Sequence, residues 1–310
     1  MARYSLGVSA TSYLRVWEAI DTLEFLERCH RFGAAGVQAV LHGDPLRIRA
    51  EAEKRDMYVE AMVPLPSGEN TEEFEQSLKD AQAAGAVAMR AACLGTRRYE
   101  TFQTFDAWQA HVAESEKSLE AAMPLLDKYK IPLGLENHKD WTADQLASLV
   151  RKYSSEYFGV CLDFGNNISL LDLPMEAIEI LAPYTVTTHV KDIAVDTYED
   201  GILLSEVIVG KGLIDLPRAV NLIRETHPKT RMNLEMITRD PLKIPLLKDE
   251  YWRTLPDKKA ADLARMLHFV NHNKSAGQLP QVFDLTPAAL DQKEDQNVNK
   301  CLAEWQGLSL

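Results

Sequence analysis

Residues 131–140 read IPLGLENHKD, an apolar run of strand length that ends abruptly in Glu136, Asn137 and His138. A strand buried on both faces of a parallel sheet is typically such a near-continuous apolar run. Polar side chains are costly inside a strand of this kind unless they have partners. A carboxylate, an amide and an imidazole at its C-terminal end therefore indicate a functional site, provided that other strands end in the same way.

Similar short apolar runs alternate with longer amphipathic ones over residues 1–240. The runs predicted as strands are 3–9, 36–42, 57–63, 86–95, 131–137, 158–166, 185–192 and 230–237. Helices are predicted between them, for example over 105–129 and after the N-cap residues Thr71 and Thr142. Eight strand–helix units in order predict an α/β protein with a (β/α)8 TIM barrel. An open doubly wound sheet is the alternative, and the lack of a GxGxxG motif after the first strand disfavours it.

Two segments depart from this repeat. Residues 198–216 are too long for a simple loop and predict a small hairpin over the barrel mouth. Residues 241–310 are first Pro-punctuated and aromatic and then amphipathic, which predicts a C-terminal helical extension. We therefore divide the chain into a catalytic barrel, 1–240, and an extension, 241–310, that packs on the barrel. The extension carries apolar residues that a complete barrel does not need, which predicts a homodimer or tetramer interface over part of it: Leu246, Leu247, Tyr251, Trp252 and Trp305.

Three further strands carry a charged or imidazole side chain near the end at which barrel enzymes place their active sites. Asp163 ends the sixth strand, His189 lies in the seventh, and Glu235 lies in the eighth, so that these residues and Glu136 come from four consecutive strands. Three converging carboxylates repel one another unless a cation lies between them. Oxygen ligands with one imidazole suit Mn²⁺, Mg²⁺ or Co²⁺, with Mn²⁺ expected first. Any one of the four residues alone is better explained as a loop or helix-capping residue than as a ligand, and it is the four on successive strands that indicate a metal site.

The motifs LGLENH, VCLDFGNN, VTTHVKD, VGKGLID and NLEMITRD cover about residues 130–240. In their order and spacing the chain resembles the sugar phosphate isomerase/epimerase superfamily with a xylose-isomerase-like barrel. The resemblance implies that Glu136, Asp163, His189 and Glu235 bind one divalent metal ion. It also implies that the two glutamates act as an acid/base pair, one on each face of the substrate carbon.

Two positions differ from the ketose epimerases of that superfamily. Asn166 stands where those enzymes have a His after the Asp ligand, and Val195 stands where they have an Arg after the His ligand. This argues against a free-ketose 3-epimerase. The endonuclease branch uses three zinc ions and needs further His and Asp ligands that this sequence lacks. Together with the net charge of −12, the missing ligands argue against a nucleic-acid partner.

The chemistry expected of such a site starts from the weak acidity of a C–H bond beside a carbonyl. One glutamate removes the proton and the other returns it, while the metal stabilises the enediolate. This predicts a divalent-metal-dependent sugar isomerase or epimerase with a small-molecule sugar or sugar-acid substrate. A metal-dependent lyase or decarboxylase acting on a keto-sugar or sugar acid with the same site is the alternative. A non-catalytic barrel that binds a polyol or a partner protein is a further reading, which the four intact ligands disfavour.

Other polar residues are candidates for roles around the metal. Strand alternation places His138 and Lys191 on the inward side together with Glu136 and His189, as additional catalytic groups. His138 is explained equally well as a loop imidazole bonded to backbone, and Lys191 as the partner of Asp192 or of a metal ligand. Arg90 and Asn166 are candidates for substrate binding, and Arg90 either reaches the mouth or pairs with an inward carboxylate such as Glu60. His42 and Gln38 on the second strand are weaker candidates for the same role.

The composition sets outer bounds on function. No Lys/Arg block, signal peptide or membrane-spanning run is evident, so neither an anionic membrane nor nucleic acid is expected as a partner. Cys29, Cys93, Cys161 and Cys301 lie far apart, without a CxxC pair. Scattered cysteines are typical of a reducing compartment, so we expect a cytoplasmic protein.

Overall fold

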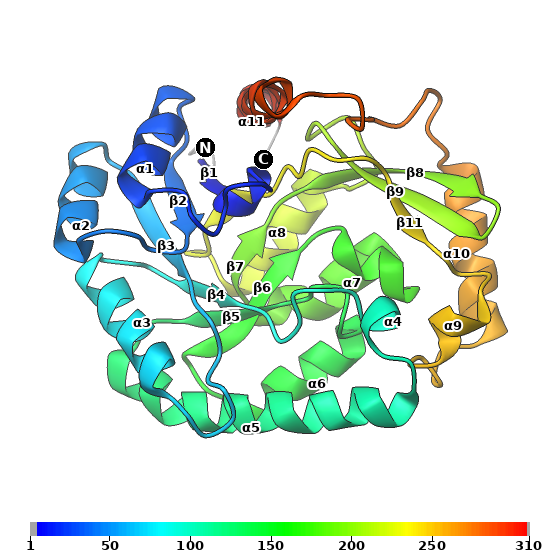
Figure 1. Ribbon diagram of the computed structural model, residues 1–310, viewed down its shortest axis with the longest axis horizontal. Helices are drawn as coiled ribbons and strands as arrows, with labels where there is room; N and C mark the ends of the chain where they lie inside the picture. The colour runs from blue at the N-terminus through cyan, green and yellow to red at the C-terminus, as the bar shows by residue number, and fades with distance from the viewer. Residues whose placement is uncertain (1–4, 309–310) are drawn as a thin grey trace.

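Eight parallel strands form a closed barrel at the centre of the computed structural model, which describes residues 5–308 (Figure 1). They are β1 (Leu6–Ser9), β2 (Gly36–Ala39), β3 (Tyr58–Met62), β4 (Met89–Ala91), β5 (Leu133–Glu136), β6 (Phe158–Asp163), β7 (Thr185–His189) and β10 (Met232–Leu234). Neighbours pair in chain order, and β10 pairs with β1. The last seam closes through Val190, whose N–H donates to Asn233 O at 2.7 Å and whose oxygen accepts from Glu235 N–H at 2.8 Å.

The closed seam confirms the TIM barrel and excludes the open doubly wound sheet. The strands are shorter than the predicted runs: β4, for example, covers Met89–Ala91 of the predicted 86–95. Residues 3 and 4 of the first predicted strand lie outside the described part of the chain.

Helices follow the strands and surround the barrel. They are α1 (Thr22–Arg31), α2 (Pro45–Lys54), α3 (Glu72–Ala83), α4 (Arg98–Thr101), α5 (Phe105–Tyr129), α6 (Ala143–Tyr153), α7 (Pro174–Leu181) and α8 (Leu216–Thr226). The predicted cap at Thr142 is confirmed, since Thr142 and Gln145 form a reciprocal capping box. Thr71 is the N-cap residue of α3 as predicted, but its side chain makes no capping hydrogen bond, and Asn70 Oδ1 accepts the Glu72 N–H at 3.2 Å instead.

The sequence did not single out α2. Asp44 caps it and Pro45 starts it, as expected of a helix N-terminus. Its apolar stripe is weak, because only Ile48 and Ala52 are buried. A surface helix with so narrow a stripe gives little periodic signal.

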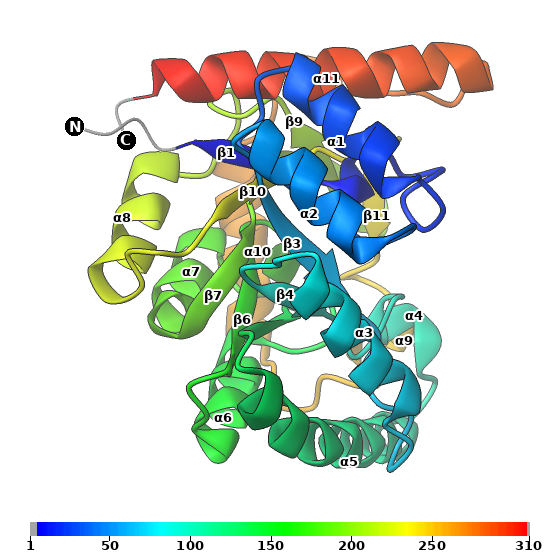
Figure 2. The same cartoon turned by 90° about the vertical axis from the view of Figure 1, so that its left-hand side faces the viewer.

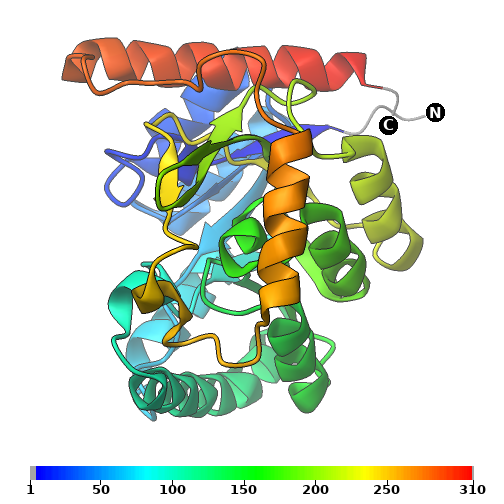
Figure 3. The same cartoon turned by 90° about the vertical axis from the view of Figure 1, so that its right-hand side faces the viewer.

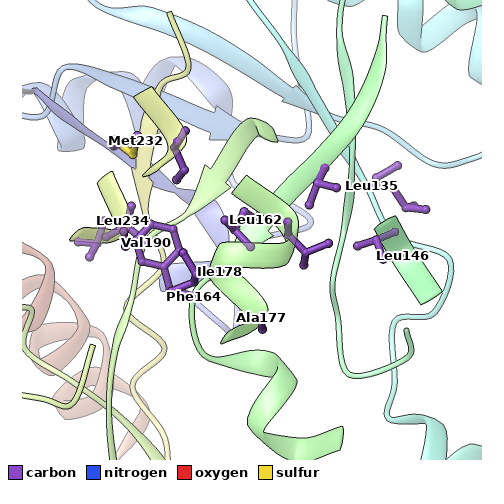
Figure 4. Packing of buried hydrophobic residues seen from close by; sticks show 14 of the residues in the cluster. Leu135, Leu146, Leu162, Phe164, Ala177, Ile178, Val190, Met232 and Leu234 are labelled. Atoms are coloured by element: carbon purple, nitrogen blue, oxygen red, sulfur yellow. The ribbon is translucent and has the colours of Figure 1, made fainter. Parts of the chain in front are cut away.

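The core lies between the barrel strands and the surrounding helices. Figure 4 shows Leu135, Leu162 and Val190 of the barrel near Leu146 of α6 and Ile178 of α7. Each of these side chains is shielded from solvent, and full burial of one such aliphatic side chain contributes about 1.5–3 kcal/mol. This packing holds the strand ends, and with them the polar side chains, in fixed positions.

The predicted hairpin is present after β7. β8 (Asp192–Tyr198) and β9 (Gly201–Val207) are antiparallel, and β11 (Leu242–Ile244) adds a third strand. In Figure 3 this small sheet and α10 (Ala260–His272) lie along the side of the barrel opposite α1–α3. The hairpin brings Glu206 into the barrel mouth, as described below.

The C-terminal segment packs on the barrel. It contains α9 (Asp249–Trp252), α10 and α11 (Pro287–Gly307). Figure 2 shows α11 crossing one end of the molecule above α1 and β9, where Asp295 accepts hydrogen bonds from Tyr13 and Arg28. Of the apolar residues noted in this segment, Leu246, Tyr251 and Trp305 are buried within the chain, Trp252 is partly buried, and Leu247 is exposed. No helix among residues 5–308 is both long enough and apolar enough to cross a membrane.

Candidate metal centre

Four strand ends bring Glu136, Asp163, His189 and Glu235 together in the barrel mouth. One ligand atom of each lies within 4.8 Å of those of the others, and all four residues are buried. Glu136, Asp163 and His189 are the last residues of β5, β6 and β7, and Glu235 follows β10 directly. Parallel strands in a barrel end at one face, which is why residues about a hundred positions apart in the sequence meet.

The His189 ring is oriented from both sides. Nδ1 lies 3.4 Å from Glu136 Oε1 and 3.2 Å from Glu235 Oε1, while Nε2 lies 2.5 Å from Gln38 Oε1. Burial disfavours the imidazolium, but the carboxylates of Glu235 and Glu136 more than offset this and raise the pKa of His189 to about 10. Without a metal, the protonated ring is therefore one of the cations that hold these carboxylates together.

Arg90 and Lys191 neutralise the rest of the cluster. Arg90 Nε donates to Glu136 Oε2 at 2.6 Å, which places it at the mouth rather than beside Glu60. Lys191 Nζ lies 2.7 Å from Asp163 Oδ2 and also contacts Glu235 Oε2. Although burial opposes ionisation, Arg90 and His189 hold the pKa of Glu136 well below its usual range, and His189 and Lys191 do the same for Glu235. Both glutamates are thus ionised at neutral pH.

Asp163 is held mainly by backbone. Its Oδ1 accepts the N–H groups of Gly165 and Asn166 at 2.9 and 2.7 Å. Burial raises the pKa of Asp163 to about 6 despite the nearby Lys191 ammonium. Asn166 in turn donates to Glu136 Oε1 at 3.2 Å. Asn166, which stands where the ketose epimerases have a histidine, therefore helps to orient Glu136, one of the proposed metal ligands.

His138 lies beside the cluster as a neutral imidazole. Its Nδ1 lies 2.9 Å from Leu94 O, and a carbonyl oxygen can only accept, so Nδ1 carries the proton and Nε2 has the free lone pair. Burial lowers the pKa of His138 to about 4. The His138 ring is therefore bonded to backbone, as one of the two readings expected, and it also lies at the site, as the other expected.

A cavity of about 650 Å³ opens onto this cluster. Of the site residues predicted from sequence, Arg90, His138 and Glu235 line it. His42 is not among its lining residues; the His42 Nε2 lies 2.6 Å from the backbone oxygen of Glu18 instead. β2 ends three residues before His42, so strand alternation does not aim that side chain inward.

Several charged residues at the site were not predicted as site residues from the sequence, and Glu60 was named only as an alternative partner of Arg90. Lys139 and Arg239 line the cavity, and Glu206 of the β8–β9 hairpin pairs with Arg239 at 2.6 Å. Glu60 lies deeper in the barrel, where Gln38, Thr187 and Asn233 donate to it. The alternation of β2 and β3 placed Gln38 and Glu60 on one face, and this was the available signal for Glu60. Arg239 and Glu206 lie outside the barrel strands, where no such periodicity applies.

The donor set fits a divalent metal ion. Three carboxylates and one imidazole are hard or borderline ligands, as Mn²⁺, Mg²⁺ and Zn²⁺ accept in proteins. The four ligand atoms are close enough for one ion to reach all of them after small side-chain movements. Ligating groups also need outer partners that fix their orientation. Gln38 is such a partner for His189, and Asn166 and Arg90 are the partners of Glu136. Two backbone N–H groups orient Asp163.

Comparison with known proteins agrees with this fold and site. Residues 14–268 match the family described as Xylose isomerase-like TIM barrel. The chain belongs to this family, and the predicted superfamily resemblance is confirmed.

Individual relatives are more distant. A 3-oxo-isoapionate decarboxylase from Pectobacterium atrosepticum is 33% identical over 108 residues. That match covers 34% of this chain and only 39% of the relative. A D-tagatose 3-epimerase-like protein superimposes with a TM-score of 0.56 at 13% identity, covering 86% of this chain and 98% of that one. A xylose isomerase-like TIM barrel protein from Mycobacterium smegmatis, in complex with magnesium, superimposes with a TM-score of 0.52 at 14% identity, covering 88% of this chain and 98% of that one. At these identities the structural matches show the fold alone.

Proposed function

We propose that this protein is a divalent-metal-dependent carbohydrate isomerase or epimerase that removes a proton beside a carbonyl. The convergence of Glu136, Asp163, His189 and Glu235 carries the proposal. The metal, with Mn²⁺ expected first and Mg²⁺ or Co²⁺ as alternatives, would supply a Lewis acid for the substrate carbonyl oxygen. The family contains sugar-processing barrels, and solved relatives were described with magnesium or zinc bound.

Glu136 and Glu235 are the proposed acid/base pair. Both are ionised, and one carboxylate oxygen of each lies within 3.4 Å of His189 Nδ1. A carboxylate that is held by Arg90 or Lys191 has a fixed direction for proton transfer. One glutamate takes the proton from one face of the carbon, which gives an enediolate, and the other returns a proton on the opposite face.

Lys191 and His138 are proposed as further catalytic groups. The Lys191 ammonium lies between Asp163 and Glu235 and can donate to a developing oxyanion. Neutral His138 offers Nε2 as a hydrogen-bond acceptor for a substrate hydroxyl. Arg90 and Asn166 orient Glu136, and Arg90 also lines the cavity, so we assign both to substrate positioning.

A metal-dependent decarboxylase or lyase is the second candidate. The curated relative at 33% identity is a decarboxylase, although the match covers little of either chain. Loss of CO₂ from a β-keto acid that carries a hydroxyl on its α carbon leaves the same kind of enediolate that proton removal gives. The same glutamates would then act only in the reprotonation half of the reaction.

Solvent exchange distinguishes the two candidates. Metal-loaded protein is incubated in D₂O with a panel of ketoses and keto-sugar acids. An isomerase or epimerase is expected to incorporate deuterium next to the carbonyl without releasing CO₂, and a decarboxylase is expected to release CO₂ and place deuterium in the product. Glu136→Gln and Glu235→Gln should each reduce the rate by roughly 10²–10⁴-fold. Turnover at the wild-type rate by both variants, with metal content unchanged, would remove the glutamates from the mechanism.

We also propose that the chain forms a homodimer or tetramer. Leu247 and Phe283, both after residue 240, are 53% and 75% exposed. Large exposed apolar side chains are a common feature of subunit interfaces. Light scattering at micromolar concentration should give a multiple of the 34.9 kDa chain mass, and a monomeric mass would reject this part of the proposal.

A further inference from the structure

Lys139 is a buried cation that lines the cavity. It is 3% exposed, and the Nζ atom donates to Asn166 Oδ1, a neutral oxygen. Within residues 5–308, no carboxylate lies within 4.0 Å of this ammonium, whereas Lys191, Arg90 and Arg239 each have one at salt-bridge distance. A buried charge without an ionic partner is costly, so its presence requires an explanation.

The backbone at Lys139 is also unfavourable. Its φ of 65° lies in the left-handed region, which costs roughly 1–2 kcal/mol for a residue with a Cβ. Residues held in such conformations concentrate at ligand sites. The bend directs the chain between His138 and Asp140 at the end of β5, and the Lys139 side chain lines the cavity.

Arg239 supplies a second cation at the same place. Its Nε and Nη2 donate to both oxygens of Glu206, at 3.2 and 2.6 Å. This forked contact fixes the guanidinium plane and leaves N–H groups on Nη1 for another acceptor. Arg239 and Lys139 are close enough that the guanidinium, after burial and Lys191, helps to lower the pKa of Lys139 to about 8. At neutral pH the lysine is still mostly charged.

The distribution of acids along the cavity is uneven. Three of its four carboxylates, Glu18, Glu73 and Glu100, are exposed at the rim, and the fourth is Glu235. With His189 neutral, as a metal ligand must be, four carboxylates deeper in are balanced by four cations: Glu136, Asp163, Glu206 and Glu235 against Arg90, Lys139, Lys191 and Arg239. A divalent ion would therefore add positive charge that an anionic ligand can offset.

From this geometry, we propose that Lys139 and Arg239 form a subsite for the carboxylate of a sugar acid or keto-sugar acid. The assignment deepens the proposed function and rests on it for the metal beside the subsite. The ammonium and the forked guanidinium would each donate to the carboxylate, and such charge-assisted hydrogen bonds are the strong ones. The substrate would then be anionic rather than a free neutral sugar.

Calorimetric binding of D-gluconate and D-glucitol tests the subsite. The two ligands differ only in a carboxylate and a hydroxymethyl group. Metal-loaded wild-type protein should bind gluconate at least about tenfold more tightly than glucitol. Lys139→Asn removes the ammonium without adding strain, because asparagine tolerates positive φ. It should weaken gluconate binding by about 10- to 100-fold and leave glucitol binding unchanged.

Two further variants complete the test. The double variant Glu206→Gln/Arg239→Gln removes the second cation and its partner together, so that no buried charge is left unpaired, and it should also lose affinity for gluconate. Arg97→Gln removes a rim cation that pairs with Glu100 and should keep the gluconate preference. Metal content and thermal unfolding are measured for each variant to show that it is folded and loaded.

The outcomes separate the subsite from the proposed function. Wild-type gluconate affinity in folded, metal-loaded Lys139→Asn would mean that the metal alone holds the carboxylate, and the subsite would be rejected. An equal loss in Arg97→Gln would assign the preference to the general field of the cavity and also reject it. A Lys139-dependent preference in protein that binds no metal would support the subsite and reject the metal-dependent function instead.

Discussion

Gln38 and His189 meet across the barrel, with 2.5 Å between Gln38 Oε1 and His189 Nε2. The amide nitrogen of Gln38 donates to Glu60 Oε2 at 3.0 Å and to Thr187 Oγ1 at 3.1 Å, so its oxygen must face the imidazole. An amide oxygen only accepts, so Nε2 carries a proton. Nδ1 is therefore the ring atom available for a metal, and it is the atom that faces both glutamates.

Replacing Gln38 by Leu should weaken metal binding although Gln38 is not itself a proposed ligand. Outer partners of this kind typically contribute about 10–100-fold in metal affinity. Titration against a competing chelator measures the change, and Gln82→Leu on the outer helix α3 is the control. Unchanged metal affinity in folded Gln38→Leu would show that packing alone sets the ring orientation.

Metal binding should release about one proton per chain near pH 8. The pKa of His189 is raised from about 6.5 to about 10 by the two glutamates, which outweigh burial, so the metal-free ring is charged and must lose a proton to coordinate. The ring stabilises metal-free protein fully below pH 6.5, and that contribution is lost as pH rises towards 10. Calorimetry in buffers of different ionisation enthalpy counts the protons. Metal uptake without proton release would contradict this assignment.

Chelation should accordingly lower the thermal unfolding temperature more at pH 9 than at pH 6.5. At the lower pH the imidazolium still neutralises Glu136 and Glu235 when the metal is gone. At the higher pH the unfolded imidazole is neutral, so keeping the ring protonated costs free energy and it offsets the repulsion between the carboxylates less effectively. Scanning calorimetry with and without chelator at the two pH values gives the comparison. A larger effect of chelation at pH 6.5 would argue against His189 as the charge that replaces the metal.

Glu294 on α11 offers a pH test away from the metal centre. It is 1% exposed, its Oε1 accepts the Leu14 N–H at 3.2 Å, and burial raises its pKa from 4.5 to about 7. A raised carboxyl pKa contributes stability below pH 4.5 that is lost as pH rises to about 7. Glu294→Gln keeps the acceptor without the charge and should stabilise the protein at pH 8 by about 1–2 kcal/mol.

Urea unfolding of Glu294→Gln and wild-type protein at pH 5 and pH 8 measures this difference. Glu304→Gln on the same helix is the control, since Glu304 is exposed and pairs with Lys211. Parallel pH profiles for wild-type protein and Glu294→Gln would show that Glu294 remains ionised in the folded chain.

The sequence predicted the parts of the site that depend on strand periodicity. Glu136, Asp163 and His189 end buried apolar strands, so their convergence follows from the barrel alone. Periodicity says nothing about loops. This is why Lys139 was missed and why the direction of the His42 side chain, three residues after β2, did not follow from the sequence. Lys139 owes its position to a left-handed backbone residue just after β5, which no propensity indicates for lysine.

Contacts between segments far apart in the chain could not be predicted from the sequence either. Glu206 reaches Arg239 only because the β8–β9 hairpin folds over the mouth, and the hairpin was predicted without its register. The pairing of Arg90 with Glu136 rather than Glu60 depends on side-chain direction within short strands. Helix α2 was missed for a simpler reason, namely that it buries few apolar residues.

The loop that follows this hairpin depends on Asp192 and leaves no room for a side chain at Gly212. Asp192 accepts backbone N–H groups from Gly210, Gly212 and Ile214 at 2.8–3.0 Å. A Cβ on Gly212 would lie 2.2 Å from Asp192 Oδ1 and 2.5 Å from Ile193 O. Gly212→Ala should therefore destabilise the protein by roughly 1–3 kcal/mol, as overpacking does.

Urea denaturation measures this loss, and Gly277→Ala is the matched control, because nothing lies within 4 Å of a Cβ at Gly277. The control should stay within about 0.5 kcal/mol of wild type. Hydrogen exchange should further show faster exchange at residues 208–214 in Gly212→Ala, since the amides bonded to Asp192 are the ones displaced. Equal stability of the two variants, with the Asp192-bonded amides still protected, would mean that the loop moves aside at little cost and that Asp192 does not fix it.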